Sequence, residues 1–311
     1  MLSRTSIRPF LAVAVGLLAL VPAGGCGTKK KPALTIKQRL EKAEKEKSPD
    51  RQAAELLKVA KLQFAKNQES EAKETAARAI EKLKGEGEAT KFAPQLIDAG
   101  VFLASINDRK PAREALAMAV GLIDGIDDPV RKAQLYADAG AAYKANTDSS
   151  EAKATLQKAA EAAAGADERF RAEALAAVAL GYTRSGLASA AADVLDKLLG
   201  AAGNLTEPRA KAEALAAAAG VQVQTGKKKE ATKLLEEAET AAKSVERAES
   251  RAYALLAVAT ATQATGETKK ALALLKEAEK AADKVPEPSS QKKAVDKVRA
   301  VIADLEKKAK K

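Results

Sequence analysis

Few residues in this 311-residue chain could carry covalent or metal chemistry. It has one cysteine, Cys26, and no histidine, which excludes a thiolate–imidazole metal site and Cys–His nucleophilic catalysis. The serines therefore lack a histidine that could activate them. Acidic pairs such as Asp127–Asp128 lie on balanced charged stretches, whereas a glycosidase needs two carboxyl groups across a cleft. No Gly-rich phosphate loop follows a strand pattern. We predict no enzyme activity, no metal and no cofactor.

Cys26 itself stands in a pattern with a chemical meaning. Two arginines precede an apolar run over residues 10–21, which is too short to span a bilayer comfortably as a helix. Gly24 and Gly25 come directly before Cys26. This arrangement resembles the bacterial lipobox, in which the signal peptide is removed just before a cysteine that becomes the lipidated first residue. The resemblance implies a signal peptide over residues 1–25 and lipidation at Cys26.

Two other ways of processing this segment stay open. It also fits an ordinary secretory signal cut near Ala23, or an uncleaved anchor. If the lipobox is processed, we expect the chain to be exported and lipid-anchored to a bacterial membrane, facing the periplasm. In lipoproteins a residue other than Asp after the cysteine implies sorting to the outer rather than the inner membrane, and Gly27 fits that rule.

The net charge of +11 is concentrated in the flanks of the chain. Residues 51–290 carry 35 basic and 35 acidic residues, whereas the excess of lysine and arginine lies before and after them. A nucleic-acid-binding array would carry a basic stripe along its length, so we predict no nucleic-acid partner. The tether and basic linker over residues 26–50 and the basic C-terminal tail are consistent with simple solubility or with attraction to anionic lipid headgroups.

Between these flanks the sequence repeats itself with a period of about 40 residues. Leucines return at this step, and so do glycines: Leu135, Leu175, Leu215 and Leu255; Gly186, Gly226 and Gly266. A fixed period of this size is typical of stacked units that each contact only their neighbours. The composition, rich in Ala, Leu, Glu and Lys and poor in aromatic residues, favours helices that pack closely.

One unit predicts two helices joined at a glycine. Its first helix has one apolar stripe and its second helix another: Leu175, Val178, Ala179 and Tyr182; Ala191, Leu195 and Leu198. Between them, Gly186 can adopt the positive φ that ends a helix and reverses the chain. We expect Gly226 and Gly266 to do the same in the next two units.

The spacing within each unit resembles the tetratricopeptide repeat. The best match is the set Tyr136, Ala139, Gly140, Tyr143, Ala152, Leu156 and Ala159. The resemblance implies an all-α, right-handed α-solenoid of about six helix-turn-helix repeats over residues 51–285, although that family's unit, at about 34 residues, is shorter than the unit here. Residues 286–311 are expected to form a capping helix, with Ser289 at its start, and a basic tail. Membrane contact and a partner helix are alternatives for this segment.

In the tetratricopeptide family, partners bind the concave surface that the first helices line. The resemblance places these residues there: Ile97, Val101, Gln134, Lys144, Glu173, Leu180, Glu213, Val223, Tyr253 and Leu256. The Lys and Asn set with which some members hold a terminal carboxylate is absent. We therefore expect an apolar or helical segment of another envelope protein as the partner. Any of these residues could instead pack against neighbouring helices.

Two functions follow from these patterns. The first is a lipid-anchored scaffold or adaptor for protein–protein interaction in the bacterial cell envelope. The alternative is an architectural or self-associating envelope protein that links membrane and cell wall through its basic flanks.

Overall fold

The computed structural model describes residues 34–85 and 87–309. The predicted signal peptide, residues 1–25, and the predicted lipidation site Cys26 lie outside the described residues. From Ile36 onward the chain forms one compact unit. The described residues of this unit form helices and turns and contain no strand. Among these helices, none is long and apolar enough to cross a membrane.

The helices follow one another along the chain with short connections. Their bounds are α1 Ile36–Glu44, α2 Pro49–Ala65, α3 Glu69–Glu81, α4 Ala89–Ser105, α5 Arg109–Asp124, α6 Pro129–Ala145, α7 Ser149–Ala164, α8 Glu168–Arg184, α9 Ala188–Asn204, α10 Pro208–Gln224, α11 Lys228–Lys243, α12 Ala248–Thr265, α13 Thr268–Ala282 and α14 Pro288–Ala309. From α2 to α13 they pack as consecutive pairs, each stacked on the next. The predicted α-solenoid of helix pairs is confirmed.

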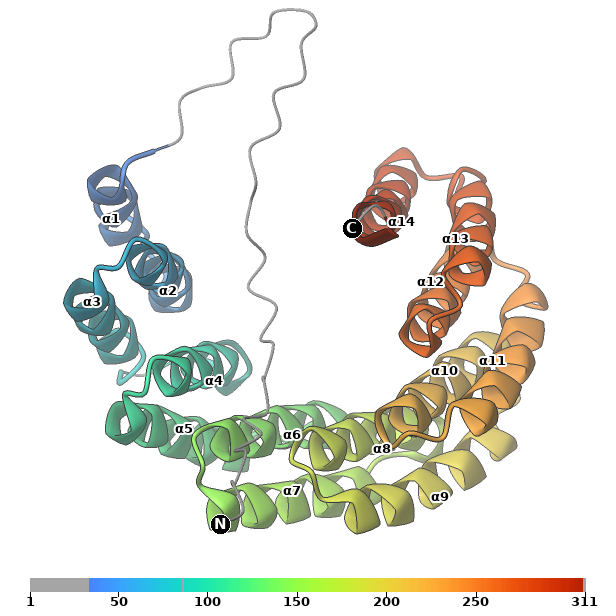
Figure 1. The fold of residues 1–311 in the computed structure, drawn as a ribbon, viewed down its shortest axis with the longest axis horizontal. Coiled ribbons are helices and arrows are strands. Elements are labelled where there is room, and N and C mark those ends of the chain that lie inside the picture. Colours follow the sequence, from blue (N-terminus) through green and yellow to red (C-terminus); the bar gives the residue numbers. More distant parts are fainter. Residues whose placement is uncertain (1–33, 86, 310–311) are drawn as a thin grey trace, which may run out of the picture. The chain divides into compact units, whose positions relative to one another are not determined.

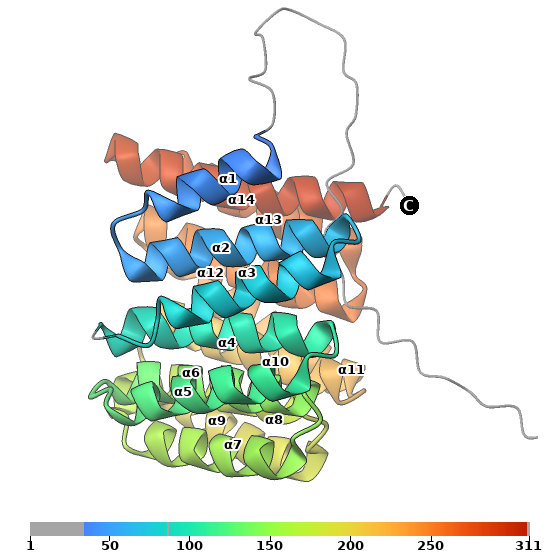
Figure 2. The same ribbon diagram turned by 90° about the vertical axis from the view of Figure 1, so that its left-hand side faces the viewer.

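The two helices of each pair lie on different sides of this unit. The even-numbered helices from α2 to α12 lie on its inner side and the odd-numbered helices from α3 to α13 on its outer side (Figure 1). Seen from the side, α2, α3, α4, α5 and α7 follow one another from top to bottom, and α6 lies behind α5 (Figure 2). The inner surface is therefore built from the first helix of each pair.

Each first helix ends at a residue in the left-handed conformation. Gly186, Gly226 and Gly266 have φ of 70°, 82° and 97°, which confirms the role predicted for them. After Gly226, for example, the amide of Lys227 donates to the Gln222 carbonyl at 2.8 Å, which closes the turn. In the first three pairs, non-glycine residues take this position, with φ of 60° to 71°: Asn67, Asn107 and Thr147.

The structural repeat is one residue short at a single junction. The left-handed residue of the third pair is Thr147 and that of the fourth is Gly186, one residue nearer than the period of the sequence predicts. Helices α6 and α8 begin at Pro129 and Glu168, which are closer by the same single residue. Tyr136, rather than Leu135, therefore corresponds to Leu175. Both Leu135 and Tyr136 are buried, which is why the constant leucine spacing gave the wrong equivalence here.

Small residues let the helices of a pair approach closely. A Cβ atom added at Gly140 in α6 would lie 2.6 Å from Leu156 Cγ and 3.2 Å from the Ala152 carbonyl oxygen, both in α7. Gly100 in α4 faces Leu116 in the same way. Most of the remaining buried residues are alanines and leucines, which fill the space between helices without long side chains.

The ends of the array are covered by single helices. α1, inside the segment predicted as a linker, packs on α2, with Ala43 fully buried. α14 packs on α12 and α13 through an apolar face that includes Val298 and Leu305. It begins at Pro288, and the carboxylate of Glu287 accepts hydrogen bonds from the amides of Ser289 and Ser290. The expected start at Ser289 was therefore wrong, because Glu287 receives these amides.

Candidate functional site: clefts on the inner surface

Among the described residues, three clefts open on the inner surface between first helices. The α4–α6 cleft has a volume of about 500 Å³. It is lined by Pro94, Ile97, Asp98, Val101, Leu135 and Asp138, together with Arg184 of α8. The α8–α10 cleft has a volume of about 400 Å³. Its lining includes Phe170, Ala172, Glu173, Leu205, Glu207 and Arg209. The α10–α14 cleft has a volume of about 580 Å³. Its lining includes Arg209, Glu213, Tyr253, Leu256, Lys297 and Val301.

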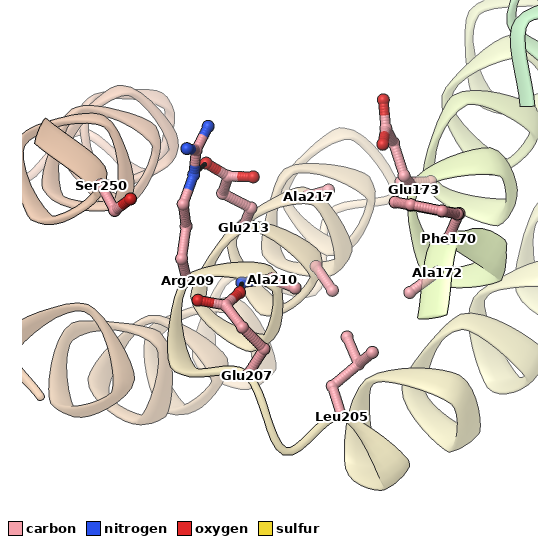
Figure 3. A pocket seen from close by; sticks show the side chains of 12 residues that line it. Phe170, Ala172, Glu173, Leu205, Glu207, Arg209, Ala210, Glu213, Ala217 and Ser250 are labelled. Atoms are coloured by element: carbon pink, nitrogen blue, oxygen red, sulfur yellow. Dashed lines mark hydrogen bonds and ion pairs between the residues drawn. The ribbon is translucent and has the colours of Figure 1, made fainter. Parts of the chain in front are cut away.

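The α8–α10 cleft combines an apolar floor with charged walls. Phe170 and Glu173 enter it from α8, Leu205 from the turn before α10, and Arg209 and Glu213 from α10 (Figure 3). Alanines of α8 and α10, including Ala217, make up most of the floor. Phe170 is 45% exposed, which is unusual for so large an apolar side chain in this protein. The short floor side chains leave depth for a larger side chain of a ligand.

Arg209 and Glu213 form the ridge between the α8–α10 cleft and the α10–α14 cleft. Arg209 Nε donates to Glu213 Oε1 at 2.8 Å, one helical turn along α10. Burial acts to lower the pKa of Arg209, but the hydrogen bond and the nearby carboxylates outweigh it and raise that pKa, so the guanidinium stays charged. Arg209 Cζ lies 5.6 Å from the centre of the Tyr253 ring, and Lys297 Nζ lies 5.0 Å from it. Tyr253 thus joins α10, α12 and α14 through two cation–π contacts.

The α4–α6 cleft has a different rim. Val101 is 42% exposed and lies beside the largely buried Ile97. Arg184 of α8 pairs with Asp138 of α6 at 3.2 Å, and Asp98 pairs with Lys61 of α2 at 2.6 Å. Both aspartates of this cleft therefore bind basic residues of neighbouring helix pairs.

The structure brings six of the ten predicted groove residues to the clefts. These are Ile97, Val101, Glu173, Glu213, Tyr253 and Leu256. Gln134 lies between the α4–α6 and α8–α10 clefts, where its Nε2 donates to Glu173 Oε1 at 2.8 Å. Leu180 and Val223 are half-buried against the core. Lys144 lies at the end of α6, where its Nζ donates to Ser149 Oγ at 3.1 Å, and it lines none of the three clefts.

Several cleft residues were not predicted from the sequence, among them Phe170, Arg209 and Lys297. Phe170 lies three residues before Glu173, so it precedes the positions that the family pattern assigns to the groove. Arg209 lies in the first turn of α10, and no spacing in the sequence singled it out. Lys297 belongs to the capping helix, outside the first helices to which the family pattern assigns the groove. The signal that could have found Phe170 is its rarity, since the chain has only five phenylalanines.

The chemistry of these clefts comes from the charged and apolar side chains that line them. Among the described residues, no group of three or more acidic, cysteine or histidine residues is placed to hold a metal ion. The charged groups at the clefts include five carboxylates, three guanidinium groups and the ammonium group of Lys297. Apolar floors with charged rims are a common feature of binding sites in proteins.

No protein-family model matches the chain, and a search of curated proteins gives no significant match. Among solved structures, the chain is similar to Ton1535 from Thermococcus onnurineus NA1, with 14% identity, a TM-score of 0.42 and coverage of 83% of this chain and 94% of that chain. It is also similar to the TPR-like repeats of a putative kinesin light chain from Podosopora anserina, with 18% identity, a TM-score of 0.38 and coverage of 64% and 98%. A Rap protein complexed with competence and sporulation factor matches at 12% identity, with a TM-score of 0.37 and coverage of 88% and 79%. Because these scores are all below 0.5, the function proposed below rests on the chain's own surface.

Proposed function

We propose that this chain is a protein-interaction scaffold whose inner clefts take an apolar or helical segment of another protein. The observation that carries the proposal is the row of clefts between the first helices, each with a largely apolar floor and charged rims. Two of the four large apolar side chains that are exposed among the described residues, Val101 and Phe170, line these clefts. Exposed apolar groups gathered in hollows with polar rims are typical of binding sites.

The proposal extends to where the scaffold works. The lipobox-like sequence before Cys26 supports export and lipid attachment in the bacterial cell envelope. The partner is then another envelope protein, and the basic flanks add attraction to the membrane.

Two changes test this proposal together in cells of a Gram-negative host. Ala217 lines both the α8–α10 and the α10–α14 clefts, so Ala217→Gln places a longer side chain where the two clefts adjoin. Cys26→Ser removes the predicted lipidation site. Intact cells that carry the wild type or either variant are crosslinked, and the captured proteins are identified by mass spectrometry. Ala154→Gln, at an exposed alanine of the outer helix α7, is the matched control.

We expect one dominant envelope partner with the wild type and with Ala154→Gln. That partner is lost in Ala217→Gln, and in Cys26→Ser the protein leaves the membrane fraction. A partner that Ala217→Gln captures unchanged contradicts binding in these clefts. Membrane attachment that survives Cys26→Ser contradicts the lipid anchor. Self-crosslinks alone favour the architectural alternative.

A further inference from the structure

We infer that the inner surface between α8 and α14 binds its partner segment with a fixed charge polarity, that is, with its basic and acidic ends in fixed places. A basic side chain of the segment lies in the α8–α10 cleft and an acidic side chain lies in the α10–α14 cleft. The inference rests on the proposed scaffold function and adds the charge pattern of the partner. It follows from the way in which the two clefts share one ion pair but not their remaining charges.

The shared ion pair is Arg209 and Glu213. Both residues line both clefts, and they neutralise each other through the 2.8 Å hydrogen bond between Nε and Oε1. Arg209 is further held by the ring of Tyr253. This pair therefore divides the two clefts without giving either of them a net charge.

The charges that remain have opposite signs. Among the described residues that line the α8–α10 cleft, Glu173 and Glu207 are left, and no cation is left. Glu207 Oε2 accepts the Ala210 amide at the start of α10, and one oxygen of Glu173 accepts from the neutral Gln134 amide, so neither carboxylate is paired with a basic side chain in these contacts. Among the described residues of the α10–α14 cleft, Lys297 is left and no carboxylate is left. A segment that crosses both clefts meets negative charge at α8 and positive charge at α14.

Apolar contacts hold such a segment between the two charged ends. Ala217 lies in both floors, and Phe170 and Leu256 add larger apolar surface at either side. Packed helix axes lie about 8–10 Å apart, so the path from α8 across α10 to α12 is roughly 20 Å. A helix of about 13 residues covers this length at 1.5 Å per residue. The occupant is therefore an amphipathic helix with leucines along one face, lysine near one end and glutamate near the other.

The polarity is tested with synthetic peptides of about 16 residues, long enough for that path as a helix. Each peptide has leucine and alanine in the middle, two lysines at one end and two glutamates at the other, and both chain directions are made. A photo-crosslinking phenylalanine analogue is placed beside the lysines in one peptide and beside the glutamates in another. The labelled residues on the purified full-length chain are mapped by mass spectrometry.

We expect the lysine end to label the α8–α10 cleft and the glutamate end to label α12 and α14, whichever chain direction the peptide has. The double variant Glu173→Lys/Lys297→Glu leaves the α8–α10 cleft without net charge, because Glu207 remains there, and makes the α10–α14 cleft negative. The lysine end is therefore expected to move to α12 and α14, which inverts the labelling. Lys233→Glu/Glu237→Lys, two exposed residues on the outer helix α11, is the matched control and leaves the labelling unchanged. The milder variants Glu173→Gln and Lys297→Gln each weaken the peptide about two- to fivefold at low salt.

Other outcomes overturn the inference in distinguishable ways. Peptides that bind with either end in either cleft, or labelling that the charge swap does not invert, refute the polarity and leave the scaffold function standing. No binding of any peptide also refutes the polarity, while the scaffold function is decided separately by partner capture with Ala217→Gln. Unchanged circular dichroism and thermal unfolding of each variant ensure that the result reports binding rather than loss of the fold.

Discussion

Gln134 of α6 and Glu173 of α8 hydrogen-bond to each other across two helix pairs, with 2.8 Å between Nε2 and Oε1. Both were expected to face a partner. In the structure they also connect the third and fourth pairs, at the junction where the repeat is one residue short. A side chain on the inner surface can therefore stabilise the fold. The second carboxylate oxygen of Glu173 takes no part in this hydrogen bond, so it can still contact a ligand.

Gln134→Ala is expected to lower the free energy of unfolding by about 0.5–1 kcal/mol, because the contact is a partly exposed hydrogen bond. Urea unfolding followed by circular dichroism measures the change. In a double-mutant cycle with Glu173→Ala, the second change costs almost nothing once the first is made. If the free-energy changes of the two single variants simply add in the double variant, the hydrogen bond contributes nothing to stability.

Gly226→Val is expected to destabilise the protein by at least about 1–2 kcal/mol, because a side chain at φ 82° has to adopt the left-handed conformation. No neighbouring atom lies within 4 Å of the added Cβ, so the cost is one of backbone conformation rather than of a clash. Thermal unfolding of the two proteins measures it. Equal stability would contradict this account of the helix ends.

At the same position in the third pair, a substitution is expected to raise the stability rather than lower it. Thr147 is β-branched and has φ 71°, so Thr147→Gly relieves strain. The gain is limited to about 1 kcal/mol, because glycine also increases the entropy of the unfolded chain. Thr240→Gly, in the interior of α11, is the control and lowers the stability. A loss of stability in Thr147→Gly would contradict the prediction.

Gly140→Ala tests the close approach of α6 and α7. Inside a helix this change normally stabilises by about 1 kcal/mol. Here the added Cβ would lie 2.6 Å from Leu156 Cγ, so we expect a net loss of about 1–3 kcal/mol instead. Gly121→Ala, in α5 and with no neighbouring atom within 4 Å, should show the normal gain. Urea unfolding measures the change in the free energy of unfolding for each variant. If both variants changed it in the same direction, the role of packing at Gly140 would be refuted.

The docking of α14 is expected to weaken in acid. Hydrogen bonds from the side chains and amides of Ser289 and Ser290 lower the pKa of Glu287 from its usual value of 4.5 to about 2. A lowered pKa means that this stabilisation is complete above the usual pKa and is lost as the pH falls through about 2.

The difference in unfolding midpoint between the wild type and Glu287→Gln should therefore be largest near neutral pH and shrink in acid. Glu306→Gln, an exposed position in the same helix, is the control. A difference that does not depend on pH would show that the carboxylate of Glu287 is not the group responsible.

The helix pairs and their left-handed ends were predictable because both depend on local patterns. An apolar stripe followed by Gly186 is sufficient to indicate a helix, its buried face and its end. The shortened step between the third and fourth pairs was not predictable in this way. Leu135 and Tyr136 are adjacent and both suit the buried face, and the fit of Gly140 beneath Leu156 decides between them.

The inner clefts were predictable only in part. The family pattern places Glu173, Glu213 and Tyr253 on the correct surface because it follows the rotation of one helix. Arg209 and Lys297 approach Tyr253 from separate helices, and contacts between distant segments leave no periodic signal in the sequence. The opposite charges of the two clefts therefore became visible only in the folded chain.

The charged outer side of α14 has a consequence for the size of the particle. Another unit would have to stack on that side to lengthen the array, but the exposed residues of α14 include Lys292, Lys293 and Asp296. Removing these groups from water without partners is costly. These charges therefore disfavour the stacking of a further unit against α14.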